Sequence, residues 1–159
     1  MQKIAVFPGS FDPFTLGHLD LVQRALELFD TVYVAIGCNA DKRTLYPVDS
    51  RKAMIADALR GCSRVQIEAY EGLTVQFCQR VGAQYILRGL RSSIDFEYEK
   101  TIAQANGIVD ARVETVFLMA RAEHAPISST VVRDLIRHGG DASAFLPEGI
   151  DLSRYPKNQ

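Results

Sequence analysis

Polar side chains able to contact a phosphate gather in the short stretch from Gly9 to His18. This stretch, GSFDPFTLGH, follows an apolar run at 3–7 and precedes a run in which apolar residues recur at helical spacing. A helix that begins at such a turn offers free N–H groups and the positive end of its dipole, and both favour an anion. The stretch supplies Ser10, Thr15 and His18 but no lysine. It therefore predicts a site that polarises a phosphate rather than a tight clamp around one.

His18 is expected in the first turn of this helix, facing the same opening as Ser10. Gly9 is expected to let the chain leave the strand with unusual backbone angles. A histidine so placed can donate a hydrogen bond to a phosphate oxygen, and the helix dipole should lower its pKa in the free protein. The plainer interpretation is a histidine that satisfies the backbone at a helix start; the complete motif favours the functional one.

Two arginines surround a glycine in Arg88-Gly89-Leu90-Arg91, directly after a short strand expected at 85–87. Each guanidinium can bind a phosphate with its planar fork of donors and does not lose its charge. Lys42 lies in a polar loop after the second expected strand, where a simply solvated lysine is the alternative. This placement predicts that basic side chains meet at one edge of a sheet.

Three consecutive hydroxyl residues begin another expected helix at Ser128-Ser129-Thr130, with Arg133 one turn later. Ser or Thr at such a position is most often an N-cap. Three in a row exceed what capping needs, so the segment is also a candidate for a second phosphate site.

Strand-like and helix-like runs alternate along the chain, which predicts an α/β fold: a doubly wound five-stranded parallel sheet with helices on both faces. The polar segments described above follow four of the five strands and would meet at the carboxyl edge, where such folds bind ligands. We expect strands at 4–7, 31–36, 65–69, 85–87 and 114–119. We expect helices at 17–28, between 47 and 61, and at 73–81, 95–107 and 128–139, then one short helical piece and a frayed C-terminal end.

Composition narrows the class of protein. The 159 residues carry a net charge of -1, which argues against broad nucleic-acid binding, and the length suits one domain over residues 1–159. No apolar run is long enough to span a membrane, and three cysteines without C-x-x-C spacing indicate reduced thiols in a cytoplasmic protein. The G-x-G-x-x-G, P-loop and G-x-S-x-G motifs are absent, which disfavours dinucleotide dehydrogenases, P-loop enzymes and serine hydrolases.

The first stretch resembles the T-x-G-H signature of the nucleotidyltransferase superfamily, and Ile127–Arg133 resembles its second signature, ISSTxxR. Arg88–Arg91 followed by Asp95–Glu99, then Asn106 and 117–119, is similar to the bacterial phosphopantetheine adenylyltransferases. The resemblance extends from Lys3 to about Gly149. It implies a Rossmann-like nucleotidyltransferase fold and the reaction of ATP with 4′-phosphopantetheine to give dephospho-coenzyme A and pyrophosphate.

The resemblance also implies roles for individual residues. His18 would hydrogen-bond the α-phosphate in the transition state, Lys42 would orient the attacking phosphate, and Arg91 with the second helix start would hold the β- and γ-phosphates. Phosphopantetheine would contact Ser10, Lys42, Thr74 and Arg88. ATP would contact Ser10, Phe11, His18, Gly89, Leu90, Arg91, Glu99, His124, Ala125, Pro126, Ile127, Ser128, Ser129 and Thr130.

The same resemblance implies a magnesium ion, inhibition by coenzyme A and a homohexamer. Carboxylates are not clustered in the sequence, so no protein residue is predicted as a metal ligand and ATP phosphates with water would hold the ion. Two alternatives stay open at this point. One is a cytidylyltransferase or a nicotinate-mononucleotide adenylyltransferase, which share both signatures but not the Arg88–Glu99 combination. The other is a non-catalytic nucleotide sensor.

Overall fold

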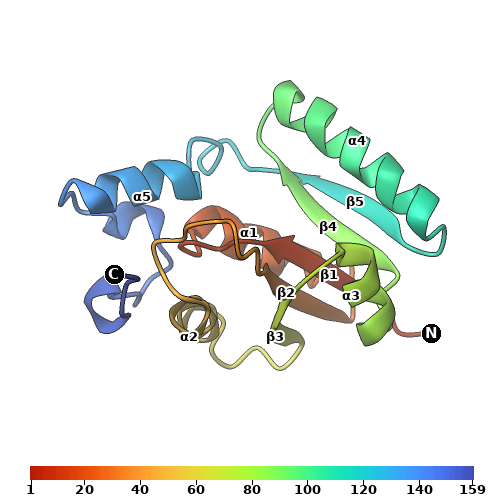
Figure 1. The fold of residues 1–159 in the computed structure, drawn as a ribbon, viewed down its shortest axis with the longest axis horizontal. Coiled ribbons are helices and arrows are strands. Elements are labelled where there is room, and N and C mark those ends of the chain that lie inside the picture. Colours follow the sequence, from red (N-terminus) through yellow and green to blue (C-terminus); the bar gives the residue numbers. More distant parts are fainter.

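Strand β1 (Ile4–Gly9) lies at the centre of the sheet because it is apolar on both faces. In the computed structural model, which describes residues 1–159, Ala5 and Phe7 pack on one face of the sheet and Val6 on the other. All pairings are parallel, and the strand order is β3-β2-β1-β4-β5 (Figure 1). The predicted doubly wound α/β fold is confirmed.

The remaining strands and the helices alternate along the chain as expected. Helices α1 and α2 pack on the face of Ala5 and Phe7, α3 packs on the face of Val6, and α4 runs along β4 and β5 (Figure 1). The other strands are β2 (Thr31–Gly37), β3 (Val65–Tyr70), β4 (Tyr85–Leu90) and β5 (Glu114–Met119); the helices are α1 (Leu16–Ala25), α2 (Val48–Ala58), α3 (Thr74–Val81), α4 (Ser93–Val109) and α5 (Ser129–Arg137), with short 3₁₀ turns η1 (Ser143–Phe145) and η2 (Leu152–Arg154).

The order of the strands reverses beside β1, between β1 and β4. Their pairing is limited to Ala5 with Tyr85 and Val6 with Ile86, whereas β1 pairs with β2 along its whole length. Beyond Val6 the carboxyl ends of β1 and β4 no longer form a ladder. This is the switch point at which open α/β sheets leave a crevice for ligands.

Several predicted boundaries were wrong. Strand β4 continues to Leu90, so Arg88 and Gly89 belong to the strand instead of following it. Helix α4 begins at Ser93, two residues before the predicted start, because Ser92 caps it by accepting the N–H of Asp95. Helix α1 ends at Ala25 rather than Leu28.

The C-terminal end is docked rather than frayed. The backbone N–H of Asn158 donates to the carbonyl of Leu45 at 2.9 Å, and Ser50 donates to the carbonyl of Pro156 at 2.7 Å. Buried Tyr155 donates to Asp57 at 2.6 Å. These long-range contacts outweigh the polar composition that suggested fraying, and two short helical turns replace the single one expected. None of the helices is both long and apolar enough to cross a membrane.

Candidate active site

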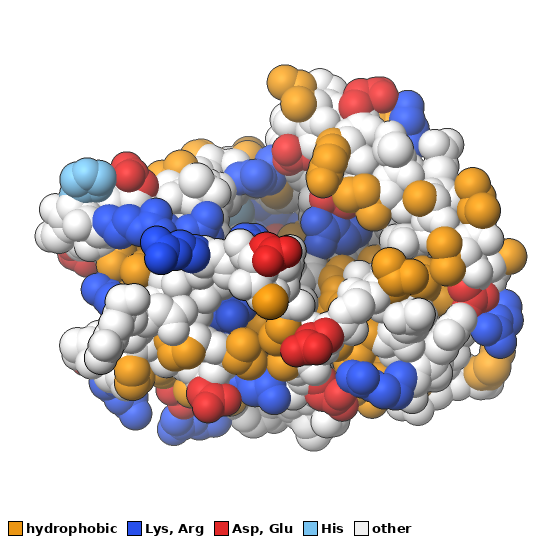
Figure 2. All heavy atoms as spheres, in the orientation of Figure 1, with side chains coloured by type: hydrophobic (Ala, Val, Ile, Leu, Met, Phe, Trp, Pro, Cys, Tyr) orange, Lys and Arg blue, Asp and Glu red, His pale blue; other side chains and the backbone are white.

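A cleft of about 610 Å³ opens where β1 and β4 separate. Figure 2 shows it as a hollow in the middle of the molecule with basic side chains on its walls. Four cations (Lys42, Arg88, Arg91 and Arg133) and two carboxylates (Asp95 and Glu99) line it, which leaves a positive excess suited to a polyphosphate. Helices α1 and α5 both begin at this cleft; Gly17, His18 and residues 128–130 line it from their first turns.

The turn between β1 and α1 is shaped by Phe11 rather than by Gly9. Phe11 adopts a φ of 49°, the left-handed region that a bulky residue rarely occupies, whereas Gly9 continues the strand. Gly9 serves a different purpose: a Cβ there would lie 3.0 Å from the Phe11 ring. The ring of Phe11 is buried and packs at 5.2 Å from Phe7 and 5.0 Å from His18. The turn is thus held by aromatic packing.

Replacing Phe11 with alanine should therefore lower the free energy of unfolding by about 3–5 kcal/mol, the usual cost of deleting a buried aromatic ring. The exposed Phe96 on α4 is a matched control, and Phe96→Ala should cost far less. Urea unfolding of the two variants measures the difference. Equal losses would show that the aromatic packing beneath the turn contributes little.

His18 caps its own helix with one ring nitrogen and leaves the other free. Thr15 is the N-cap of α1, and the backbone N–H of Thr15 donates to Nδ1 of His18 at 3.0 Å. Because Nδ1 accepts this bond, the proton of the neutral ring sits on Nε2. Nε2 makes no hydrogen bond within the protein, and His18 lines the cleft, so an N–H donor is available to a ligand. The capping interpretation is confirmed for Nδ1, and the functional interpretation stays a prediction for Nε2.

Burial lowers the pKa of His18 to about 3, with the neighbouring charges of Arg88 and Arg91 acting in the same direction. The lowered pKa agrees with the prediction, although these causes differ from the helix dipole invoked there. The free site therefore holds a neutral imidazole at physiological pH. Such a ring donates from Nε2 without carrying a charge of its own.

This pKa gives the stability of the protein a defined pH dependence. The unfolded chain protonates His18 below its ordinary pKa of 6.5, whereas the folded protein resists protonation down to about 3. Stability from this residue is therefore fully present above pH 6.5 and is lost as the pH falls through that window. We expect the unfolding free energy of the wild type, measured relative to that of His18→Gln, to fall by about 3 kcal/mol between pH 7 and pH 4. A difference that does not vary with pH, in urea titrations at each value, would mean that His18 titrates normally.

Lys42 reaches the cleft from the loop after β2. Its side chain is exposed, and its Nζ donates to the hydroxyl of Ser10 at 2.6 Å. This bond joins the loop to the turn after β1, although the two residues lie 32 positions apart in the sequence. The structure thus brings together the lysine that the first stretch lacks and the hydroxyl that the stretch supplies.

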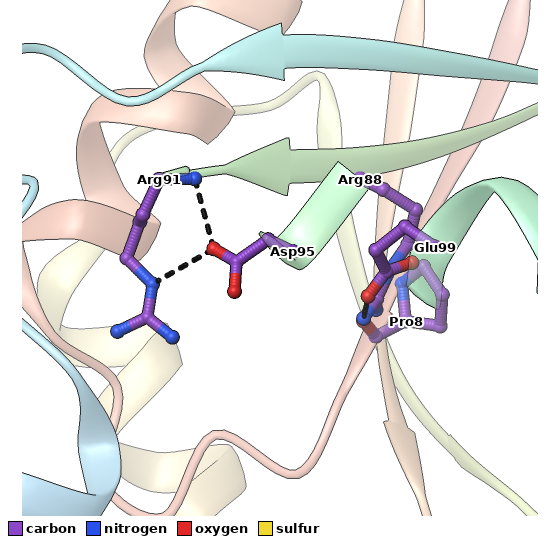
Figure 3. A network of polar contacts seen from close by, with 5 residues as sticks. All are labelled: Pro8, Arg88, Arg91, Asp95 and Glu99. Atoms are coloured by element: carbon purple, nitrogen blue, oxygen red, sulfur yellow. Dashed lines mark hydrogen bonds and ion pairs between the residues drawn. The ribbon is translucent and has the colours of Figure 1, made fainter. Parts of the chain in front are cut away.

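Arg88, in β4, and Arg91, directly after β4, are each held by a carboxylate of α4, as Figure 3 shows. Arg88 donates from Nε and Nη2 to Glu99 at 2.9 and 2.6 Å, and from Nη1 to the carbonyl of Pro8 at 2.7 Å. The Pro8 carbonyl is thus satisfied by a side chain at the level where the β1–β4 ladder has ended. Nε of Arg91 lies 3.5 Å from Oδ2 of Asp95. The Arg91 side chain is half exposed, so it keeps N–H donors free for a ligand.

The start of α5 uses each hydroxyl differently. Ser128 is the N-cap and accepts the N–H of Val131, while Ser129 donates to the carbonyl of Pro13 at 3.0 Å. Thr130 accepts a bond from Arg133, whose other nitrogen donates to the carbonyl of Asp12. These bonds fix α5 to the turn after β1, and residues 128–130 at its start line the same cleft.

A second cavity of about 250 Å³ adjoins the cleft and shares Pro8, Gly9, Ser10, Arg88 and Glu99 with it. Thr74, the predicted substrate contact, lies here, and its hydroxyl is 2.8 Å from the Tyr70 hydroxyl. The sequence did not reveal as substrate contacts the other residues that line this cavity alone. They include Tyr70, Ile86, Ile102, Ala103, Asn106 and Thr115.

Most of the predicted ATP contacts line the cleft, but three do not. Leu90 is buried, and Ala125 and Pro126 lie in the loop before α5 without lining either cavity. The sequence reasoning also missed Ile94 and Tyr98 of α4, exposed apolar and aromatic residues that do line it. Large apolar side chains among the acidic residues of this helix start are a signal for them, but Phe96 carries the same signal and does not line the cleft. The predicted residues that line the cleft are Ser10, Phe11, His18, Lys42, Arg88, Gly89, Arg91, Glu99, His124, Ile127, Ser128, Ser129 and Thr130.

No group of three or more histidine, cysteine, aspartate or glutamate side chains is arranged to hold a metal ion. Both carboxylates of the cleft, Asp95 and Glu99, are engaged by arginines. A divalent cation in this cleft would thus take most of its ligands from phosphate and water.

Comparison with known proteins identifies the class first. The family model described as cytidylyltransferase-like matches residues 6–135. Together with the cleft at the starts of α1 and α5, this match identifies the protein as a nucleotidyltransferase. A bifunctional NMN adenylyltransferase/ADP ribose pyrophosphatase from Francisella tularensis superposes with a TM-score of 0.67 at 18% identity, over 96% of this chain and 46% of its own. A putative nicotinate-nucleotide adenylyltransferase from Vibrio parahaemolyticus superposes with a TM-score of 0.63 at 22% identity, over 92% and 94%. At such identities these two structures establish the fold alone.

The particular family follows from closer relatives. The phosphopantetheine adenylyltransferase of Flavobacterium psychrophilum is 47% identical over 150 residues, which cover 94% of this chain and 98% of the relative. That of Bacteroides thetaiotaomicron is 43% identical over 153 residues, covering 96% and 100%. The chain belongs to the phosphopantetheine adenylyltransferase family.

Proposed function

We propose that this protein transfers the adenylyl group of ATP to 4′-phosphopantetheine and releases dephospho-coenzyme A and pyrophosphate, a step of coenzyme A biosynthesis. The observation that carries the proposal is the convergence on one cleft of Ser10, His18, Lys42, Arg88 and Arg91. The chain that carries them belongs to the phosphopantetheine adenylyltransferase family. Each of these residues comes from the carboxyl end of a strand, from the loop that follows it, or from the start of the next helix.

The chemistry is a single displacement at phosphorus. An oxygen of the acceptor phosphate forms a bond to the α-phosphorus of ATP, and the bond from that phosphorus to the bridging oxygen of pyrophosphate breaks. The acceptor phosphate is largely doubly ionised near neutral pH, because the second pKa of a phosphate ester is about 6. It therefore needs no base, which agrees with His18 offering a donor at Nε2 and no free acceptor.

Catalysis then consists of placing the two phosphates in line and stabilising the charge that develops. Nε2 of His18 would donate to an oxygen of the α-phosphate, while Lys42 beside Ser10 orients the acceptor phosphate. Arg91 and the N–H groups at the start of α5 would hold the β- and γ-phosphates. Because the neutral ring accepts the Thr15 N–H at Nδ1, its Nε2 donor is already held in position before ATP binds.

The second cavity supports phosphopantetheine as the acceptor. It begins at Ser10 and Arg88, where the acceptor phosphate is proposed to bind, and continues between α3 and α4. Its walls combine apolar Ile86 and Ile102 with the amide of Asn106 and the hydroxyl of Thr74. A pantetheine arm has the same character, an aliphatic chain with two amides, so the cavity offers both packing and hydrogen-bond partners.

Magnesium is proposed as the cofactor, brought in with ATP. The positive lining of the cleft and its arginine-bound carboxylates suit an ion held by phosphate oxygens and water, with no protein cage. When bound, the ion neutralises negative charge on the phosphates. Asp95 and Glu99 keep Arg91 and Arg88 in place at the same time.

We extend the proposal to the oligomeric state of the protein, its inhibition and its cellular location. Helix α4 and strand β5 expose Ile94, Tyr98, Ile108, Val109 and Met119, and Figure 2 shows hydrophobic atoms spread over this side of the molecule. An apolar surface of this kind supports self-association, and we propose a homohexamer. Coenzyme A contains the pantetheine arm, so it is proposed to inhibit by occupying the second cavity. The site of action is proposed to be the cytoplasm.

A matrix of acceptors and nucleotides tests the reaction. The protein is incubated with ATP or CTP and with 4′-phosphopantetheine, nicotinate mononucleotide or a phosphorylated alcohol, and pyrophosphate release is followed. Only ATP with phosphopantetheine should give efficient release. Efficient release with another pair would assign the chain a different nucleotidyl transfer, and tight ATP binding without release from any pair would make it a nucleotide sensor.

A further inference from the structure

Two charged residues beside the cleft are buried and line neither cavity. Asp12 is 2% exposed and Arg51 is 4% exposed, and neither reaches the space where substrates would bind. Buried charges are costly to desolvate and often add nothing to stability over apolar residues of similar size. Their partners therefore indicate what they do.

Both carboxylate oxygens of Asp12 bind the backbone of the loop that carries Lys42. The N–H of Leu45 donates to Oδ2 at 2.8 Å, and the N–H of Tyr46 donates to Oδ1 at 2.9 Å. Only a carboxylate presents an acceptor to each of two adjacent N–H groups in this way. Asp12 thus attaches the turn after β1 to the loop three residues beyond Lys42.

Arg51, on α2, closes the same connection from the other side. Its Nε donates to the carbonyl of Tyr46 at 3.0 Å, and its Nη1 donates to the carbonyl of Ser10 at 2.8 Å. The rigid fork of the guanidinium spans a carbonyl of the loop and a carbonyl of the turn at once. Ser10 is the residue whose hydroxyl accepts the bond from Lys42.

The exposed side chain of Lys42 has no other side-chain partner, so the position of its ammonium depends on where the loop and Ser10 are held. We infer that Asp12 and Arg51 are positioning residues for the transfer reaction: together they fix Lys42 and Ser10 at the distance from which they orient the acceptor phosphate. The inference rests on the proposed function for the identity of that phosphate. The connection itself stands on the contacts within the protein.

Asp12→Asn and Arg51→Lys test this inference with little change in size. Asparagine turns an NH₂ group toward a backbone N–H, and lysine lacks the fork that spans two carbonyls. We expect each variant to lower kcat/KM for phosphopantetheine about ten- to hundredfold, since a shift of about 1 Å at a reacting group has effects of this size. The KM for ATP should stay unchanged, because His18, Arg91 and α5 are untouched. Asp110→Asn is the matched control: Asp110 is also a buried carboxylate, held by Arg112 and Gln79 after α4, and its loss should lower the melting temperature without changing either KM.

A second comparison separates positioning from mere stability. In a Lys42→Met background, Arg51→Lys should cause no further loss, because the group that it positions is gone. The same loss with and without Lys42 would show that Arg51 only supports the fold and would overturn the inference.

Crystal structures of wild type, Asp12→Asn and Arg51→Lys give an answer that does not depend on turnover. We expect the Lys42 ammonium to leave Ser10 in both variants. An unchanged contact of 2.6 Å in either would overturn the inference. If wild-type protein failed to convert ATP and phosphopantetheine, the proposed function would fall, while these structures would still decide whether Asp12 and Arg51 hold Lys42.

Discussion

Replacing His18 with alanine is expected to lower turnover about a hundred- to thousandfold, the usual cost of removing one donor to a developing oxyanion. The loss should fall on kcat, because the Nε2 donor is needed most when the α-phosphate gains charge in the transition state. Pyrophosphate release with saturating ATP and phosphopantetheine measures it. His18→Gln, which retains an N–H donor on a more flexible side chain, should retain more activity than His18→Ala.

His138 is the matched control for this experiment. It lies at the C-terminal end of α5, is exposed and lines neither cavity, and its Nδ1 is 2.8 Å from the carbonyl of Asp134. His138→Ala should therefore leave turnover unchanged. Near-normal turnover of His18→Ala would remove His18 from the mechanism, whatever its place in the cleft.

Replacing Lys42 with methionine is expected to have the second largest effect, a fall of about a hundredfold in kcat/KM for phosphopantetheine. Methionine keeps most of the aliphatic stem but cannot donate to the acceptor phosphate or to Ser10. The KM for ATP should change little, because Lys42 lies on the Ser10 side of the cleft, where the two cavities join. Steady-state kinetics with each substrate varied in turn measures this split.

The neighbouring Arg43 separates a local contact from general electrostatic attraction. Arg43 is exposed and lines neither cavity, so Arg43→Met removes the same charge from the same loop without touching the site. It should have a small effect that disappears as salt is added. Equal losses in the two variants would mean that Lys42 acts through the overall field rather than through contact.

Much of the fold follows from periodicity, because buried parallel strands are continuously apolar and their helices show one apolar face. The apolar run at 3–7 predicted the first strand on these grounds, and the alternation of elements predicted the sheet. The ends of elements were less predictable. Strand β4 includes Arg88 because the guanidinium finds Glu99 and Pro8 as partners, and no local pattern reveals those contacts.

The site was predictable where one segment carries its own signal, as at Gly9–His18 and at the start of α5. It was not predictable where distant segments cooperate. The capping bond that fixes the tautomer of His18 requires the geometry of Thr15, and the second cavity joins residues of α3 and α4 that share no motif. Asp12 and Arg51, which hold the loop of Lys42, likewise lie 39 positions apart in the sequence. The docked C-terminal end depends on the hydrogen bond from Asn158 to Leu45.

The most direct test of the account is to follow oxygen atoms from acceptor to product. The protein is given ATP and 4′-phosphopantetheine whose three non-bridging phosphate oxygens are ¹⁸O, and the products are weighed by mass spectrometry. Attack of the acceptor phosphate on the α-phosphorus predicts dephospho-coenzyme A that retains all of the label and an equal amount of unlabelled pyrophosphate. Formation of ADP would instead show attack on the γ-phosphorus, and AMP without dephospho-coenzyme A would show attack by water; either result would contradict adenylyl transfer in this cleft.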